Sequence, residues 1–106
     1  MILRKLSRGE NIVVMNMRDT YSELGTYEFK VVLDPKIFKG GCAADIEVRD
    51  SDGEPISSLV RPWGTKLMCK FTIDDGCSDG VATVKVHALD SSERWVDEYL
   101  QFWVIK

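Results

Sequence analysis

Hydrophobic and polar residues alternate along most of this chain, and each alternating stretch ends at a turn signal after about ten residues. In "TYEFKVVL" (26–33), aromatic and aliphatic side chains alternate with Thr26, Glu28 and Lys30, which is the pattern of a half-buried strand. Helical periodicity is weak throughout. The same reasoning predicts extended strands over residues 10–17, 43–50, 56–60, 65–73, 81–89 and 95–105.

The apolar side of each strand is the predicted core. Its members from the first strands are Tyr27, Phe29, Val31, Leu33, Ala44, Ile46 and Val48, and those from the later ones are Leu67, Cys69, Phe71, Ile73, Ala82, Val84, Val86 and Ala88. In the last stretch, "RWVDEYLQFWVIK", both sides are apolar. Val96, Leu100, Phe102 and Val104 share one side, and Tyr99, Trp103 and Ile105 share the other. Either another protein surface covers Tyr99, Trp103 and Ile105, or these side chains are exposed to water.

Turn chemistry separates the strands. Pro35 and the pair Gly40–Gly41 interrupt the ladder after residue 33, while "DSDGEP" (50–55) and "DDGCSDG" (74–80) supply residues that tolerate positive φ. About seven short strands in about 100 residues predict an all-β fold, namely an immunoglobulin-like, two-sheet antiparallel sandwich. A small closed barrel is the alternative. The expected organisation is an N-terminal arm (1–9) followed by one sandwich domain (10–106).

The amino-acid composition limits the classes of protein to which this chain can belong. The chain has 106 residues, 44% hydrophobic and 29% charged, which suits one globular domain. A net charge of −3 without long single-sign blocks argues against a nucleic-acid-binding module. No apolar run is long enough to span a membrane, and the short run "IVVMNM" leads to no cleavage site of a secretory signal. We therefore expect folding in a cytoplasm.

The segment "DGVATVKVHALDSSERWVDEYLQFWVI" resembles the last two strands of immunoglobulin-like domains of the bacterial and phage type. Asp79 and Gly80 match the opening turn, Asp90 matches the second turn, and 102–105 match the aromatic closing strand, while "VRDSDGEP" (48–55) is similar to the central hairpin. The Cys…Trp…Cys spacing of antibody domains is not present. Isolated domains of this kind resemble accessory proteins of tailed bacteriophages, which decorate capsids or attach to necks and tails.

The resemblance implies a non-enzymatic structural role on a virion, assembled in the host cytoplasm, with the phage capsid or tail lattice as partner and further subunits as possible neighbours. A carbohydrate-binding or host-surface adhesion module is the alternative function. A cytoplasmic adaptor that pairs through its sheet edge is a third hypothesis.

Little in the sequence indicates chemistry. His87, the single histidine, has no nucleophile or orienting acid at a recognisable spacing, and phosphate-binding or zinc-protease motifs do not occur. The acidic stretches around Asp50 and Asp74 are better explained by hairpin turns than by calcium, since calcium needs six to eight converging oxygens. Cys69 and His87 are expected on opposite sides of their strands, which disfavours zinc. We expect no enzyme activity, cofactor or metal.

The three cysteines have different expected roles. Cys69 reads as a small core residue, whereas Cys42 and Cys77 lie in Gly-rich loops and are expected to be accessible. On a virion outside the cell, Cys42 and Cys77 could form an intersubunit disulfide, with free thiols as the alternative.

Exposed aromatic and basic residues are the candidate partner interface. Trp63, in "RPWG", either plugs one end of the sandwich or acts as a binding residue beside Arg61. Trp103 either packs under the N-terminal arm or meets another subunit. The arm "MILRKLSR" is either a frayed end or a segment that orders on a partner. The complete candidate interface is Ile2, Leu3, Arg4, Lys5, Leu6, Arg61, Trp63, Tyr99 and Trp103.

Overall fold

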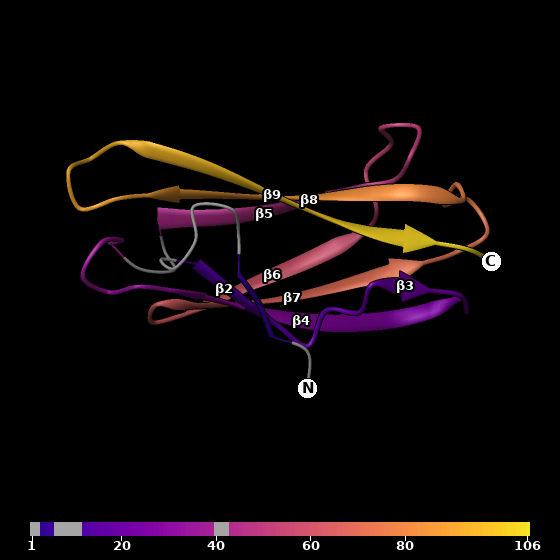
Figure 1. Cartoon of the computed structure of the whole chain (residues 1–106), viewed down its shortest axis with the longest axis horizontal. Helices are drawn as coiled ribbons and strands as arrows, with labels where there is room; N and C mark the ends of the chain where they lie inside the picture. The colour runs from indigo at the N-terminus through magenta and orange to yellow at the C-terminus, as the bar shows by residue number, and fades with distance from the viewer. Residues whose placement is uncertain (1–2, 6–11, 40–42) are drawn as a thin grey trace.

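Two β-sheets packed face to face make up the protein, as the computed structural model in Figure 1 shows. The structure describes residues 3–5, 12–39 and 43–106. The first sheet contains, in order, β1 (Leu3–Lys5), β2 (Ile12–Met15), β4 (Gly25–Leu33), β7 (Lys66–Ile73) and β6 (Ser58–Trp63). The second contains β3 (Thr20–Tyr21), β9 (Trp95–Val104), β8 (Gly80–Leu89) and β5 (Ala44–Arg49). The predicted all-β, two-sheet sandwich is therefore confirmed.

Seven of the nine strands in the described residues have four or more residues, in line with the expected number. The other two are short: β1 has three residues and β3 has two. The described strand pairs are antiparallel, as predicted, except that β3 pairs in parallel with β9. The reason is that the chain leaves the first sheet after β2 and crosses to the second, where it meets the C-terminal end of β9.

Alternation along each strand places one set of side chains between the sheets. β7 and β8 illustrate this, because Leu67, Cys69, Phe71 and Ile73 are all buried and so is every second residue of β8 from Ala82 to Ala88. The centre of the core is aromatic. The ring of Phe71 lies 5.2 Å from that of Tyr21, 5.8 Å from Phe29 and 5.4 Å from Phe102, measured between ring centroids. These contacts join both sheets and add edge-to-face attraction to the burial of apolar area.

At the right-hand end of Figure 1, the loop after β5 and the loop between β7 and β8 are joined by one buried carboxylate, that of Asp50. Its Oδ1 accepts the backbone N–H of Asp52 and of Glu54, and its Oδ2 accepts the N–H of Ser78, at 2.9, 3.0 and 3.2 Å. Burial alone would raise the pKa of Asp50, but these hydrogen bonds outweigh it and the pKa lies below its ordinary value. The acidic stretch thus has the turn role predicted for it.

Part of the predicted N-terminal arm belongs to the first sheet. β1 pairs with β2 in the register Leu3↔Met15 and Lys5↔Val13. Residues 1–2 and 6–9 of the arm, with Ile2 and Leu6, lie outside the described residues. No helix in the described part of the chain is long and apolar enough to cross a membrane.

Candidate binding surfaces

The predicted interface residues do not form one surface. Arg61 and Trp63 are on β6, and β1 is at the opposite edge of the same sheet. Tyr99 and Trp103 are on β9, in the other sheet, and their side chains point away from the core. The sandwich therefore offers two candidate binding surfaces, the outer faces of its two sheets.

The outer face of the first sheet is rich in cations. Strand register places Arg61, Met68 and Lys30 side by side across β6, β7 and β4, and it pairs Trp63 with Lys66. The next rung holds Leu59, Lys70 and Glu28. We call the surface made by Lys30, Arg61, Trp63, Lys66 and Lys70 the basic face.

None of the four cations of the basic face forms an ion pair or a side-chain hydrogen bond with another described residue. The described ion pairs lie elsewhere, for example Lys39 with Glu93 and Lys85 with Asp97. Four unpaired positive charges beside a single carboxylate, that of Glu28, stand out in a chain whose net charge is −3. This surface is electrostatically suited to an anionic partner.

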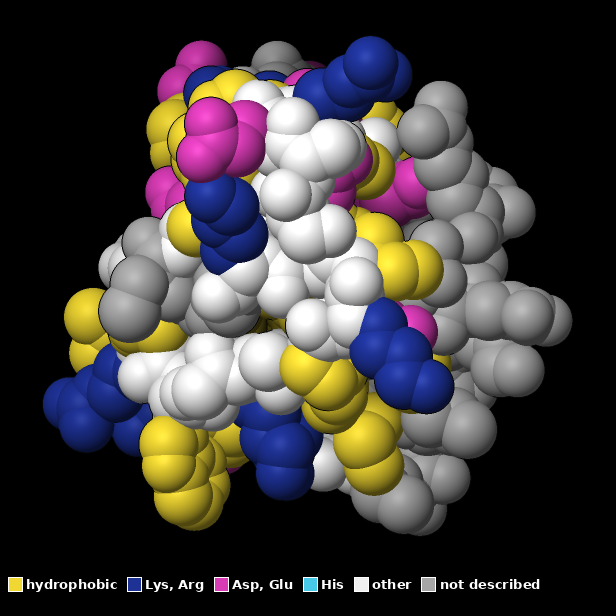
Figure 2. Space-filling model, turned by 90° about the vertical axis from the view of Figure 1, so that its left-hand side faces the viewer, with side chains coloured by type: hydrophobic (Ala, Val, Ile, Leu, Met, Phe, Trp, Pro, Cys, Tyr) yellow, Lys and Arg dark blue, Asp and Glu magenta, His cyan; other side chains and the backbone are white. Residues whose placement is uncertain are grey.

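Trp63 is the most exposed large hydrophobic side chain described, at 73% of its full accessibility. The strand predicted over 56–60 extends further than expected, because β6 continues through Pro62 to Trp63 and the chain turns only at Gly64, whose φ is +63°. On the outer side of an edge strand the indole cannot plug the end of the sandwich, so that interpretation is wrong. In the end view of Figure 2, hydrophobic and Lys or Arg side chains alternate over the lower half, and most acidic ones visible lie in the upper half.

The outer face of the second sheet carries three large aromatic side chains along β9. Trp95, Tyr99 and Trp103 are 56%, 57% and 50% exposed and follow one another at every fourth residue. The described residues of the arm do not cover Trp103, because β1 belongs to the other sheet. Asp97 and Gln101 fill the intervening outward positions. We call these five side chains the β9 row.

Charges on this second face are largely paired within the chain. The imidazole of His87 stacks on the indole of Trp95, and its Nδ1 shares a hydrogen bond with Oδ1 of Asp97. This bond lowers the pKa of Asp97. The Nζ of Lys85 lies 4.0 Å from Oδ2 of Asp97, and Arg49 bonds Glu47. His87 thus has an acidic partner that its spacing in the sequence did not reveal, because only the β8–β9 register brings residues 87 and 97 together.

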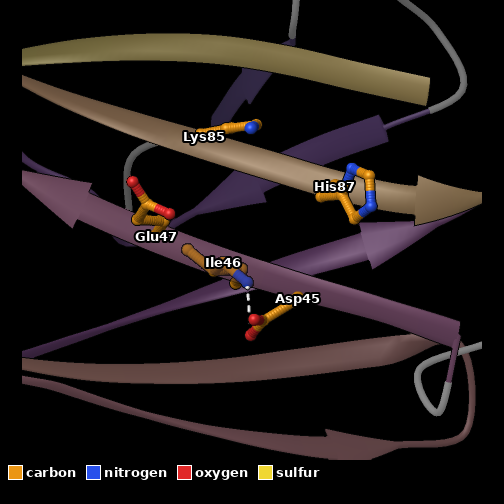
Figure 3. Close-up of a pocket in the computed structure, with 5 residues that line it drawn as sticks. All are labelled: Asp45, Ile46, Glu47, Lys85 and His87. Atoms are coloured by element: carbon orange, nitrogen blue, oxygen red, sulfur yellow. Dashed lines mark hydrogen bonds between the residues drawn. The ribbon is translucent and has the colours of Figure 1, made fainter. Parts of the chain in front are cut away.

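A shallow hollow of about 120 Å³ lies between β5 and β8 on this face, as the close-up in Figure 3 shows. Asp45, Glu47, Lys85 and His87 line it, but they do not converge on one point. Oδ1 of Asp45 accepts the backbone N–H of Ile46 at 2.8 Å and points away from His87. Another hollow, beside the loop at Asp50, measures about 160 Å³. Both are well below the roughly 300 Å³ at which small-molecule pockets begin.

The expected accessibility of Cys77 is wrong. Its side chain is only 5% exposed, since the loop folds inward beside Asp50. Burial, with the negative charge of Asp50, raises the pKa of the Cys77 thiol. Cys69 is fully buried as predicted, and burial raises its pKa to about 12. Cys42 lies outside the described residues, so the Cys42–Cys77 disulfide stays a prediction.

Comparison with known proteins adds information on the fold. The sequence matches no protein-family model and no curated protein sequence. Among solved structures, CopC from Methylosinus trichosporium OB3b is similar with a TM-score of 0.58 and 17% identity, over 97% of this chain and 91% of that one. The Lin-41 filamin domain is similar with a TM-score of 0.61 and 9% identity, over 90% and 92% of the two chains.

The fold is an immunoglobulin-like β-sandwich. The strand order β2-β4-β7-β6 corresponds to the A-B-E-D sheet of that architecture, and β5-β8-β9 to its C-F-G sheet. At such low identity the likeness concerns the fold alone, so the function has to be argued from the two faces of the immunoglobulin-like domain.

Proposed function

We propose that this chain is a non-enzymatic accessory protein of a tailed-phage virion, made in the host cytoplasm, that docks through its basic face on an acidic surface of the capsid or tail lattice. The observation that carries the proposal is the combination of four unpaired cations with the exposed indole of Trp63 on one sheet face. Trp and Arg are the side chains most enriched among residues that dominate binding energy.

Docking would proceed by charge complementarity followed by burial of apolar surface. Lys30, Lys66 and Lys70 steer the face toward an acidic surface, and Trp63 and Arg61 become buried at the contact. Leu59 and Met68 lie between the cations and supply further apolar contact area. Modest affinity at each site is sufficient, because a lattice repeats the site many times.

A non-enzymatic role agrees with the shallow hollows and with the partners of the one histidine. His87 is held between Trp95 and Asp97 on an open sheet face, and no described Ser or Cys side chain lies within hydrogen-bonding contact of it. Binding through surfaces is therefore the function that the geometry supports best.

The decisive experiment begins with gradient-purified phage particles from a producing culture, which are analysed for this chain by mass spectrometry. Purified protein is then added to particles that lack it, and the bound amount is measured by co-sedimentation. We expect K66E/K70E to lower the apparent affinity at least about tenfold at low salt, because two attractive contacts become repulsive. W63A is expected to lower it by a similar factor.

Lys36→Glu is the control, since Lys36 is exposed in the loop after β4, where the chain leaves the first sheet and pairs at Phe38 with Asp90. It makes the same kind of charge reversal at one position and should leave binding within about twofold. Particles that contain no copy of the chain and bind none when it is added would refute the proposal. Equal loss of binding in K36E and K66E/K70E would refute the role of the basic face.

Trp63 also supports a second candidate function, carbohydrate binding, because an exposed indole between cations can stack on a sugar ring of an anionic glycan. A glycan array probed with the wild type and with W63A distinguishes the two. Specific binding to one glycan class that is lost in W63A, together with no binding to particles, favours the adhesion module.

A further inference from the structure

The β9 row presents the same order of chemical groups from either end. Its outward side chains are Trp95, Asp97, Tyr99, Gln101 and Trp103, that is, indole, hydrogen-bonding group, phenol, hydrogen-bonding group and indole. Tyr99 is the centre of this pattern. A surface of this kind can face a second copy of itself, because reversal of the strand places each group opposite one of matching chemistry.

The neighbouring strands extend the pattern across the sheet. On β8, Leu89 is beside Trp95 and Val81 is beside Trp103, so both ends of the face are apolar. On β5, Asp45 lies one rung before the central rung of Glu47, Lys85 and Tyr99, and Arg49 lies one rung after it. When the strand direction is reversed, Asp45 therefore lies opposite Arg49 on β5.

We propose that a second copy of this chain packs on the outer face of the second sheet, related by a two-fold axis that crosses β9 at Tyr99. The axis lies in the interface, perpendicular to the strands, so that β9, β8 and β5 of one copy lie over the same strands of the other and run antiparallel to them. Trp95 then faces the partner's Trp103, and Asp97 faces the partner's Gln101. Tyr99 meets its own symmetry mate.

Opposite charges on β5 support this arrangement. Asp45 faces the partner's Arg49, and symmetry makes the same pair a second time. Arg49 has five N–H donors, of which the described structure uses one on Glu47 and one on the carbonyl of Gly53, so three remain for the partner. A shift of two residues along β9 in either direction would move Asp45 away from Arg49 and leave Trp95, Tyr99 and Trp103 of each copy opposite non-aromatic side chains.

The central rung places like charges near each other, with Lys85 over the partner's Lys85 and Glu47 over the partner's Glu47. Because Lys85 and Glu47 are neighbours on adjacent strands, the four charges form a square in which like signs face each other across the interface and opposite signs are adjacent within each copy. Each charge also has an opposite charge diagonally across the interface. These diagonal attractions partly offset the like-charge contacts, and the Asp45–Arg49 pairs outside the centre set the register.

The size of the face predicts a weak but specific dimer. The row from Trp95 to Trp103 spans about 26 Å, and three strands with their side chains span about 20 Å, which gives roughly 500 Å² per copy. Two copies bury about 1,000 Å², which is the lower limit for a specific interface. We therefore expect a dimer that forms in the micromolar range rather than an obligate one. The inference uses the sheet opposite the basic face and does not depend on the proposed function.

Sedimentation equilibrium of the purified full chain tests the dimer directly. We expect a monomer–dimer equilibrium without larger species, because a two-fold contact closes on itself. Tyr99→Lys puts two ammonium groups against each other on the axis and should raise the dissociation constant at least about tenfold. Leu59→Lys is the matched control, an exposed apolar residue of the first sheet changed in the same way, and it should leave the constant unchanged.

A charge exchange tests the register. D45R alone and R49D alone should each weaken the homodimer, because like charges then face each other twice. An equimolar mixture of the two variants should form a heterodimer about as stable as the wild-type dimer, since both pairs are opposite again. Circular dichroism and thermal unfolding of each variant show that the sandwich is intact.

Three results would overturn the proposal. One is a wild type that stays monomeric up to its solubility limit, and another is the growth of open polymers. The third is a dimer that Y99K leaves intact, or one for which mixing D45R with R49D restores nothing.

Discussion

The imidazole of His87 lies parallel to the indole of Trp95, with ring centroids 4.2 Å apart and planes 3° apart. The carboxylate of Asp97 bonds the same imidazole. The stack and the hydrogen bond together fix the orientation of the imidazole on the outer face of the second sheet.

We predict that His87→Gln changes the tryptophan emission of the folded protein at a constant neutral pH, because the variant loses the ring that stacks on Trp95. Of the described tryptophans, only Trp95 is stacked on His87.

Fluorescence spectra of the wild type and H87Q, recorded at the same protein concentration and pH, measure the difference. Identical spectra would contradict the contact between His87 and Trp95.

Gly80 is a position where only glycine fits. Its φ is +128°, and a Cβ added there would lie 2.8 Å from Cβ and 2.9 Å from Oγ of Ser51. We predict that Gly80→Ala lowers the free energy of unfolding by about 2–4 kcal/mol, since backbone strain and overlap add. Urea denaturation measures the loss.

A substitution at Gly53 tests backbone strain without steric overlap, because its φ is +82° but a Cβ there would meet nothing within 4 Å. Gly53→Ala should therefore cost only the strain, about 1–2 kcal/mol. Equal losses in G80A and G53A would show that the contact with Ser51 relaxes without cost.

Asp50 joins two loops through three backbone N–H groups. In Asp50→Asn one acceptor oxygen becomes an NH₂ donor that faces an N–H, and we predict a loss of about 1–3 kcal/mol at neutral pH. Asp75→Asn is the control, because Asp75 is exposed in the loop between β7 and β8 that Asp50 joins, and its side chain bonds no described residue. It should change stability by less than about 0.5 kcal/mol.

The pH dependence of that loss has a definite sign. The folded-state pKa of Asp50 lies below its ordinary value of 3.8, so its stabilising effect is present above that value and is lost as the pH falls through the folded-state pKa. The difference in stability between the wild type and D50N should therefore shrink below about pH 4. A difference that stays constant down to pH 2 would contradict the role of the ionised carboxylate.

The buried thiols should resist alkylation in the folded protein. With a pKa of about 12, Cys69 is ionised in only about one molecule in ten thousand at pH 8. In a Cys42→Ser variant, we predict that iodoacetamide modifies Cys69 and Cys77 at least about a hundredfold more slowly than in urea. Peptide mass spectrometry follows each site. Rapid native labelling of Cys77 would show that its loop opens readily, which the Cys42–Cys77 disulfide would require.

Much of the fold could be predicted because strand alternation is a local property. The inward positions of β5, β7 and β8 follow from period-two patterning alone. Tyr21 could not be found in this way. It lies in "RDTYSELG", which has no alternation, and it enters the core because β3 crosses to the second sheet and pairs with β9.

The two binding faces were only partly predictable, since they depend on register. The sequence identified Arg61, Trp63, Tyr99 and Trp103 as candidates, but it could not tell that the first two and the last two lie on opposite sheets. Lys30 and Lys70 join the basic face only through the β4–β7–β6 pairing. Cys77 was misjudged because a Gly-rich loop suggested exposure, whereas tertiary packing around Asp50 buries it.

The parallel pairing of β3 with β9 determines how the domain responds to a pulling force. The N–H of Trp103 and that of Ile105 donate to the carbonyls of Asp19 and Tyr21, at 2.8 and 3.0 Å. Pulling on the segment before β3 and the segment after β9 slides these strands past each other, so both bonds are loaded at once. Antiparallel neighbours such as β1 and β2 instead separate by breaking their hydrogen bonds in succession. The short strand β3 is thus a mechanical clamp, placed where force along the chain would first reach the second sheet.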